Sequence, residues 1–60
     1  MSYINAKSLL SDGFKLRRLN WDDKMYIELV DGKVILSSTN DEFHFNLSDL
    51  MSDDWEIKRN

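Results

Sequence analysis

The pattern of apolar and polar positions begins with one short helix. Residues 2–12 place apolar side chains three and four positions apart, which is the spacing of one helical face. Ser2 is suited to the N-cap, and Gly13 stands where a left-handed residue would end the helix. A helix of about ten residues is not stable alone in water. We therefore expect this helix to pack against the rest of the chain.

The next segment, residues 14–19, alternates in the manner of a short strand. The alternation places three side chains on each side of that strand: Phe14, Leu16 and Arg18 against Lys15, Arg17 and Leu19. Turn-forming residues follow at 20–23, which predicts that the strand ends there.

A β-hairpin is predicted over residues 25–38. Asp31-Gly32 suits a two-residue turn with positive φ at both positions. Such a turn pairs Val30 with Lys33, and it places five apolar side chains on one face: Met25, Ile27, Leu29, Val34 and Leu36. The opposite face is mixed, and we expect an exposed apolar patch of Tyr26, Val30 and Ile35 on it beside Glu28.

The last third of the chain predicts two more strands around a helical turn. Residues 42–47 alternate, residues 49–52 form a helical turn capped by Ser48, and residues 55–58 form a strand with Trp55 and Ile57 inward. The predicted fold class is therefore α+β: a short N-terminal helix packed on a small antiparallel sheet, with a short helical turn before the last strand.

Composition narrows the possible functions. The chain has 60 residues, a net charge of −3 and no cysteine, so we expect a single domain over residues 1–60 without disulfides. It has no apolar run of membrane-spanning length and no signal-peptide pattern at residues 1–7. An acidic chain is not expected to bind a nucleic-acid polymer. We also expect no membrane partner.

Catalytic and metal-binding patterns are absent from the sequence. His44 is the only histidine and alternates outward between two phenylalanines. The pairs Asp22-Asp23 and Asp53-Asp54 are more typical of turns than of a metal site, because neighbouring side chains on a strand point to opposite faces. No glycine-rich phosphate loop is present either. We expect no enzyme activity, no bound metal and no cofactor.

The segment 15–21 holds the strongest candidate for binding. It gathers three basic residues next to Trp21. An indole face can stack on a nucleobase, and the guanidinium groups of Arg17 and Arg18 can pair with phosphate. The alternative is that Trp21 covers one end of a small core, as aromatic residues of small domains commonly do. The same alternative is favoured for Trp55.

Two segments together resemble a known family. The first runs from Gly13 to Trp21, with Arg17-Arg18 three residues before the tryptophan, and the second is Ser48-Asp49-Leu50-Met51-Ser52-Asp53-Asp54-Trp55. In this order they resemble the phage Thoeris anti-defense type 2 family. The resemblance implies a non-enzymatic protein that sequesters a cyclic ADP-ribose isomer, or in some relatives a cyclic oligonucleotide. It also implies a homo-oligomer with pockets between subunits, acting in the host cytoplasm.

The resemblance also implies roles for residues. Trp21 would stack on the base, Asp49 would be a polar contact near the pocket, and Trp55 would be structural. The candidates in place of a second tryptophan of the family are Phe43 and Phe45, with Phe45 the closer match by spacing, and the tight Asp31-Gly32 turn replaces a longer loop. With Arg17 and Arg18 on the phosphates, the predicted ligand-binding set is complete.

A second function class remains open. Small acidic proteins also act as inhibitors or adaptors that present a charged, mixed surface to a host protein. In this interpretation the patch of Tyr26, Val30 and Ile35 beside Glu28 would be the contact surface.

Overall fold

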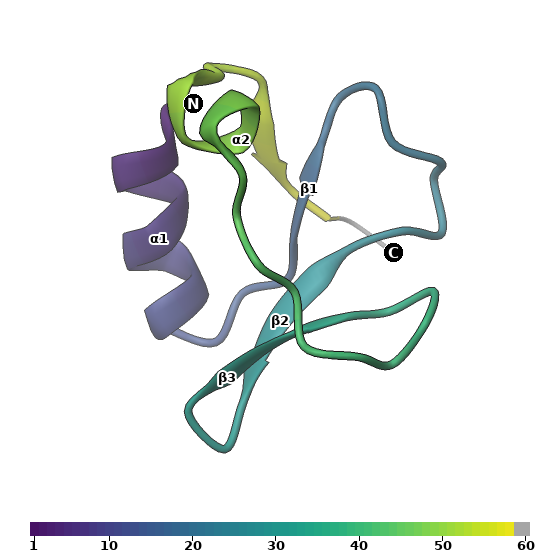
Figure 1. Cartoon of the computed structure of the whole chain (residues 1–60). Coiled ribbons are helices and arrows are strands. Elements are labelled where there is room, and N and C mark those ends of the chain that lie inside the picture. The colour runs from purple at the N-terminus through teal and green to yellow at the C-terminus, as the bar shows by residue number, and fades with distance from the viewer. Residues whose placement is uncertain (59–60) are drawn as a thin grey trace.

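The structure is a computed structural model that describes residues 1–58 of the 60 in the chain. The predicted domain extends to residue 60, and residues 59 and 60 lie outside the described residues. The elements follow one another as α1 (Tyr3–Ser11), β1 (Leu16–Arg18), β2 (Ile27–Val30), β3 (Lys33–Leu36), α2 (Leu47–Met51) and β4 (Trp55–Ile57) (Figure 1). This order confirms the predicted α+β class.

The first helix begins and ends where its sequence signals indicate. The Ser2 side chain accepts a hydrogen bond from the Asn5 N–H, as an N-cap does. Gly13 has φ +97, and the amides of Gly13 and Phe14 donate to the carbonyls of Leu10 and Leu9. That pair of bonds is the motif in which a left-handed residue stops a helix. The local signals of this helix therefore agree with its observed bounds.

The four strands form one antiparallel sheet in the order β3-β2-β1-β4. The predicted register of the hairpin is confirmed: Val30 pairs with Lys33, and Ile27 pairs with Leu36. Asp31 and Gly32 both have positive φ, 52° and 79°, as the predicted turn requires. The chain then returns across the molecule, so that β1 has β2 on one side and the last strand on the other (Figure 1).

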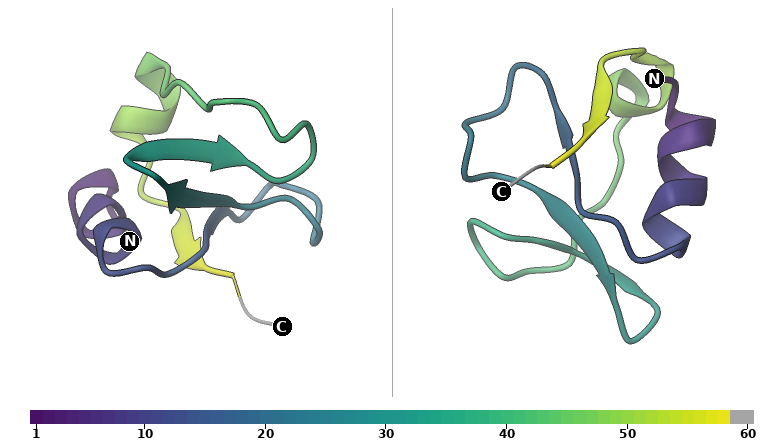
Figure 2. Two further views of the ribbon diagram at one scale, coloured as in Figure 1. Left: turned by 90° about the horizontal axis from the view of Figure 1, so that it is seen from below. Right: turned by 180° about the vertical axis from the view of Figure 1, so that it is seen from behind.

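The core lies on one face of this sheet. Helix α1 contacts β1, β2 and β4, and the segment that leads to α2 runs over the same side (Figure 2). Among the described residues, no helix covers the other face (Figure 2). Within residues 1–58, five apolar side chains are buried between these layers: Ala6, Leu10, Leu16, Ile27 and Trp55. Trp55 is therefore a core residue, which confirms the prediction for it.

Several predicted boundaries were wrong. The second helix covers Leu47–Met51 and not residues 49–52, and the last strand covers Trp55–Ile57 and not 55–58. The first strand covers Leu16–Arg18 and not the whole of 14–19. Residues 42–47 do not form a strand, because the outer edge of β3 is paired with this segment only through a bridge between Ile35 and Glu42. The N-cap of the second helix is Asn46 and not Ser48, since the Asn46 side chain accepts from the Asp49 N–H.

The hairpin turn generates a test of local conformation. Gly32 has φ +79 and no atom lies within contact distance of an added Cβ, so a side chain there meets backbone strain only. We predict that Gly32→Ala lowers the free energy of unfolding by about 1–2 kcal/mol. Gly32→Asn should cost clearly less, because asparagine tolerates this conformation. Urea titration followed by circular dichroism measures both, and equal losses for the two variants would contradict the turn assignment.

Candidate functional site: two arginines on opposite faces of one strand

Strand β1 sends its two arginines to opposite faces of the sheet. Leu16 and Arg18 face the core side, and Arg17 between them faces the other side, because side chains alternate along a strand. The structure therefore does not bring the two predicted phosphate contacts together. Each arginine instead belongs to a separate cluster.

Arg18 is held by three side chains from the region of α2 and β4. Its Nη1 donates to Asp49 Oδ1 at 2.9 Å, and its Nε donates to Asp54 Oδ1 at 2.9 Å. Its Nη2 donates to Ser52 Oγ at 2.6 Å. The Arg18 side chain is mostly buried, and its planar fork uses all three nitrogen atoms in these bonds. Arg18 thus ties α2 and the start of β4 to β1.

Asp49 is the buried partner in this cluster. It is 5% exposed, and its second carboxylate oxygen accepts from the Asn46 N–H at 3.0 Å. The Asn46 side chain in turn accepts from the Asp49 N–H, which completes a capping box at the start of α2. The Asp49 carbonyl accepts from the Trp55 indole N–H at 3.0 Å. The predicted polar ligand contact is therefore engaged by protein groups on both carboxylate oxygens.

Four aromatic rings close a cycle of edge-to-face contacts next to this cluster. Trp21 packs on Phe43 and on Trp55, with ring centroids 5.7 Å and 5.6 Å apart. Phe45 completes the cycle, with centroids 5.1 Å from Phe43 and 5.8 Å from Trp55. Such pairs contribute roughly 0.5–1.5 kcal/mol each beyond the area they bury. The structure thus links Trp21 and Phe45 through two rings, and not by direct stacking of one on the other.

Trp21 differs from Trp55 in its exposure and in its hydrogen bonds. Trp55 is 2% exposed, whereas Trp21 is only partly buried at the end of a turn that follows β1. The Trp21 backbone N–H donates to the Arg18 carbonyl at 3.0 Å, which fixes that turn. Among residues 1–58, the Trp21 indole N–H makes no hydrogen bond, whereas that of Trp55 is bound. Trp21 is therefore both a packing residue and a ring with free surface.

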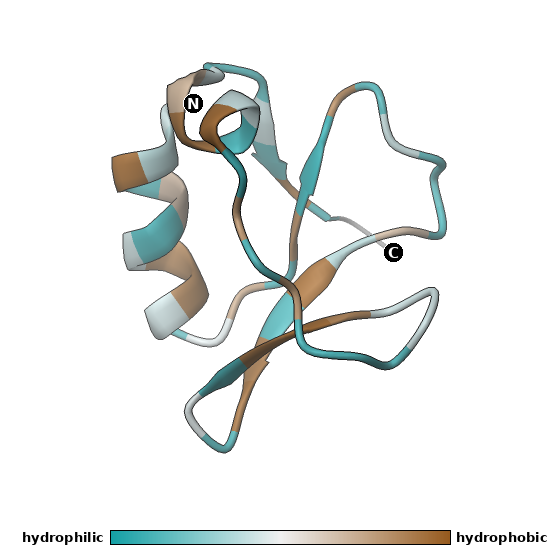
Figure 3. Cartoon of the chain, in the orientation of Figure 1, coloured by the Kyte–Doolittle hydropathy of each residue, from teal (hydrophilic) through white to brown (hydrophobic). Residues whose placement is uncertain are grey.

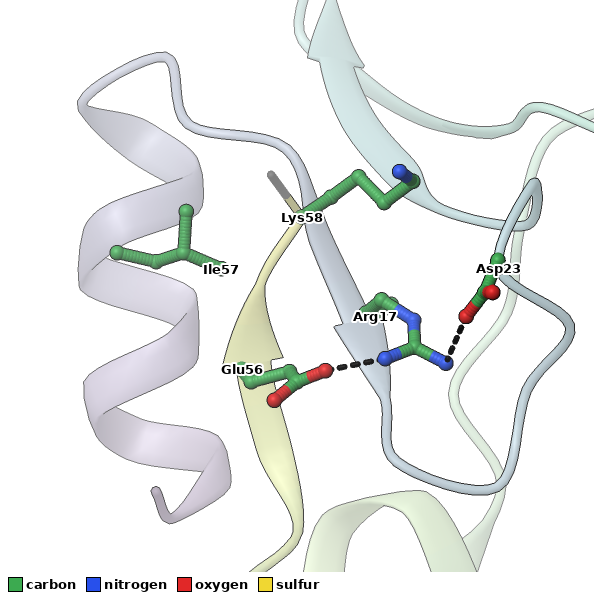
Figure 4. Close-up of a pocket in the computed structure, with 5 residues that line it drawn as sticks. All are labelled: Arg17, Asp23, Glu56, Ile57 and Lys58. Carbon is green, nitrogen blue, oxygen red and sulfur yellow. Dashed lines mark hydrogen bonds and ion pairs between the residues drawn. The ribbon is translucent and has the colours of Figure 1, made fainter. Parts of the chain in front are cut away.

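Arg17 forms the second cluster on the outer face of the sheet. It makes an ion pair with Glu56 on β4, a longer one with Asp23 at 3.7 Å, and a hydrogen bond to the Trp21 carbonyl at 2.6 Å. Among residues 1–58, no group accepts a hydrogen bond from its buried Nε. Figure 4 shows the Arg17 guanidinium between the two carboxylates, with the Lys58 side chain on the same side and Ile57 pointing away toward α1.

A pocket of about 300 Å³ opens beside Arg17. It is lined by residues of β1, β4 and the loop after β1: Arg17, Asp23, Glu56, Ile57 and Lys58. Two basic and two acidic side chains balance there, so the pocket has no excess charge of either sign. Among the described residues, no group of three or more histidines, aspartates or glutamates is arranged to hold a metal ion.

Sequence reasoning missed the partners of the predicted site residues. The sequence did not predict the hydrogen bonds of Arg18 with Asp54 and Ser52, or the ion pair of Arg17 with Glu56. It also did not predict that Phe43 lies between Trp21 and Phe45. A signal for Phe43 existed in the alternation of residues 42–47, which places Phe43 and Phe45 on one side. The pairing of β1 with β4 gave no local signal.

Comparison with known proteins identifies the family. A family model described as the Thoeris anti-defense 2-like domain matches residues 1–58. The chain belongs to the Thoeris anti-defense 2-like family. Proteins of the Thoeris anti-defense 2 family sequester Thoeris signalling nucleotides and are generally non-enzymatic. No curated protein and no solved structure matches the chain. In this Thoeris anti-defense 2-like domain, neither described helix has the length and apolar character that a membrane crossing requires.

The two arginines allow a matched comparison of the same substitution. We predict that Arg18→Met lowers the free energy of unfolding by about 3–5 kcal/mol, because it leaves the buried Asp49 carboxylate without its cation. Arg17→Met should cost much less, since the carboxylates of Glu56 and Asp23 can be rehydrated. Urea midpoints measure both variants. Equal losses, or a larger loss for Arg17→Met, would contradict the assigned roles.

The stability of the fold at low pH depends on Asp54. The hydrogen bond from Arg18 is the main cause that lowers the pKa of Asp54 below the ordinary value of an aspartate. In the window below that ordinary value, about 3.9, the unfolded chain binds a proton at this position that the folded chain does not. The stabilisation from Asp54 is therefore present above this window and is lost as the pH falls through the lowered pKa.

We predict that Asp54→Asn makes the acid limb of the stability curve less steep than in the wild type. Melting temperatures between about pH 2 and pH 7 measure this slope. Asp12→Asn, which removes an exposed carboxylate at the end of α1, is the control and should leave the slope unchanged. An unchanged slope in Asp54→Asn would show that the ion pair with Arg18 is not formed.

Proposed function

We propose that the protein binds a cyclic nucleotide signal of the Thoeris defence and sequesters it without converting it. The observation that carries this proposal is the family match, which spans residues 1–58. The ligand class is a cyclic ADP-ribose isomer or a cyclic oligonucleotide. Sequestration would act in the host cytoplasm.

Trp21 is the proposed stacking surface for the base. Its ring is partly exposed and its indole N–H has no partner among residues 1–58, so it has a face and a donor to offer. Stacking on an aromatic side chain contributes about 1–3 kcal/mol per base. Phe45 is proposed to support the ring from behind, through Phe43 and Trp55.

Arg17 and Arg18 are the proposed cations for the phosphates, and Asp49 is the proposed polar contact. The contacts of Arg18 with Asp49 and Asp54 mean that a phosphate would compete with these carboxylates, or would share the guanidinium with them. Arg17 lies at the open pocket next to the backbone of Trp21, and its side chain is about as exposed as that of Arg18, 12% against 13%.

Affinity is the physical reason to expect more than one chain at the site. A dissociation constant in the nanomolar range requires about 12 kcal/mol. One stacking ring and one partly neutralised arginine supply only a fraction of that value. A pocket shared by two chains would double both contributions, so we propose that the protein acts as a homo-oligomer.

Ligand depletion tests the proposed function directly. The purified protein is incubated with cyclic ADP-ribose isomers and, separately, with cyclic di- and trinucleotides, and is then denatured. We expect one of these compounds to be depleted from solution and recovered intact after denaturation. A cleaved product would indicate an enzyme, and depletion of none of the compounds would remove the proposal.

Trp21→Ala tests the proposed role of the indole ring. We predict that it weakens binding of the depleted compound by roughly 5- to 150-fold, the equivalent of one lost stacking contact. It also removes two ring contacts, so a structural effect must be separated. Phe43→Ala is the matched control, because it likewise removes two ring contacts without touching the proposed stacking face. Equal weakening by both variants would contradict the role of Trp21.

The sequence also left open a protein-binding inhibitor, and the outer face of the sheet is where that partner would dock. Val30 is exposed there, and Tyr26, Glu28 and Ile35 are partly exposed. A stoichiometric host protein that is retained by both the wild type and Trp21→Ala, together with no nucleotide depletion, would favour this second function.

A further inference from the structure

The loop that follows β1 carries Trp21 on a mostly hydrophilic stretch of chain. We name residues 19–24 the Trp21 loop. Figure 3 shows that most of this loop is hydrophilic, and Figures 1 and 2 show it on the side of the molecule away from helix α1. Leu19 is 60% exposed, and residues 20 and 22–24 are exposed as well. Apolar burial therefore holds the Trp21 loop only through the partly buried ring of Trp21 itself.

The backbone of Trp21 is bound at both of its polar groups. Its N–H donates to the Arg18 carbonyl at 3.0 Å, and its carbonyl accepts from Arg17 Nη2 at 2.6 Å. The first bond closes a turn between residues three apart. The second is charge-assisted and comes from a side chain of the central strand β1, so it ties the Trp21 loop to the sheet.

Arg17 is itself held at the other end of its guanidinium group. Its Nη1 forms the ion pair with Glu56 on β4, and Asp23 of the Trp21 loop lies 3.7 Å from its Nη2. Figure 4 shows the guanidinium group between these two carboxylates. The Arg17 side chain is 12% exposed, so these contacts are largely shielded from water. Arg17 therefore bridges from β4 to the Trp21 loop.

The bridge requires a guanidinium group and not only a positive charge. The planar fork of an arginine presents donors in two directions at a fixed separation, whereas a lysine ammonium is a compact point charge on a flexible stem. A lysine at position 17 could bind Glu56 or the Trp21 carbonyl, but it could not hold both in the same geometry. The shape of the Arg17 side chain is thus what connects the strand to the loop.

Trp21 is fixed from two sides by these contacts. Arg17 holds its carbonyl from the outer face of the sheet, and Phe43 and Trp55 hold its ring from the core side. Ordering a side chain or a loop when a ligand arrives is one of the costs of binding. A ring that is already held in place avoids that cost.

We propose that Arg17 is a positioning residue, which holds the Trp21 loop so that the indole ring is in place before a ligand arrives. The inference rests on the proposed function for the stacking role of the ring. It is distinct from the proposed contact of Arg17 with a phosphate, because it uses the nitrogen atoms that are bound to Trp21 and Glu56 within the chain itself.

Two substitutions separate the shape of the guanidinium group from its charge. Arg17→Lys keeps the charge and loses the fork. Lys15→Met is the control: it removes a positive charge just before β1, where the Lys15 Nζ lies 4.9 Å from the centroid of the Tyr26 ring, and it keeps the fork. The steady-state ¹H–¹⁵N NOE, measured without nucleotide, reports fast motion of the Trp21 backbone and indole N–H groups. The same groups of Trp55 serve as the internal reference.

We expect both NOE values of Trp21 to fall in Arg17→Lys while those of Trp55 stay unchanged, and we expect no change in Lys15→Met. Unchanged Trp21 values in Arg17→Lys would overturn the inference, and so would an equal fall in Lys15→Met. If circular dichroism shows that Arg17→Lys is unfolded, Glu56→Ala takes its place, because it removes the second anchor of Arg17. It should lower the Trp21 values in the same way, and unchanged values would again overturn the inference.

A double-mutant cycle on affinity tests whether Arg17 acts through the ring. It uses whichever cyclic ADP-ribose isomer or cyclic oligonucleotide the wild type depletes. Arg17→Lys should raise the dissociation constant roughly 2- to 10-fold in the wild type and should have no further effect in Trp21→Ala. An equal effect in both backgrounds would overturn the inference. If the wild type depletes none of these compounds, the proposed function fails, whereas the NOE values still decide whether Arg17 positions Trp21.

Discussion

The buried ion pair between Arg18 and Asp49 is the constraint on which the remaining structure depends. It joins the central strand β1 to helix α2, and the Trp55 indole binds the carbonyl of the same aspartate. Removing two charges from water is expensive, so a pair of this kind adds little net stability compared with an apolar contact. What it supplies is orientation, because α2 has only one position in which Arg18, Asn46 and Trp55 all find their partners.

That orientation assigns different tasks to the two tryptophans. Trp55 is a structural residue, with its ring in the core and its indole N–H hydrogen-bonded to the Asp49 carbonyl. Trp21 packs edge-on against Trp55 but keeps part of its surface and its donor free. The chain belongs to the Thoeris anti-defense 2-like family, and we propose that this partly exposed ring is its stacking surface for a nucleotide. The same orientation leaves the apolar side of α2 exposed to solvent.

Much of the fold could be predicted because its signals are local. The Asp31-Gly32 turn sets the hairpin register, and Ser2 and Gly13 set the ends of α1. The predicted strand over residues 42–47 failed because alternation reports which side a residue faces, and not whether a neighbouring strand is there to pair with. Phe43 and Phe45 do point inward, yet the segment leaves the edge of β3 after one bridge.

The candidate site was less predictable, because it depends on contacts between residues far apart in the chain. Arg18 forms its ion pairs with Asp49 and Asp54 because β1 pairs with β4. No sequence pattern near Arg18 predicts that strand pairing. Alternation along β1 did indicate that Arg17 and Arg18 face opposite sides, and the structure confirms it. The residue types of the candidate site could thus be predicted from the sequence, whereas the ion pairs and hydrogen bonds between these residues could not.

The most direct test of this account is the hydrogen exchange of the two indole N–H groups, which give separate signals in a ¹⁵N-correlated NMR spectrum. The account predicts slow exchange for Trp55, whose N–H is buried against the Asp49 carbonyl, and fast exchange for Trp21. Equally slow exchange of both indoles would show that Trp21 is enclosed like Trp55, and it would contradict the claim that the fold leaves this ring available.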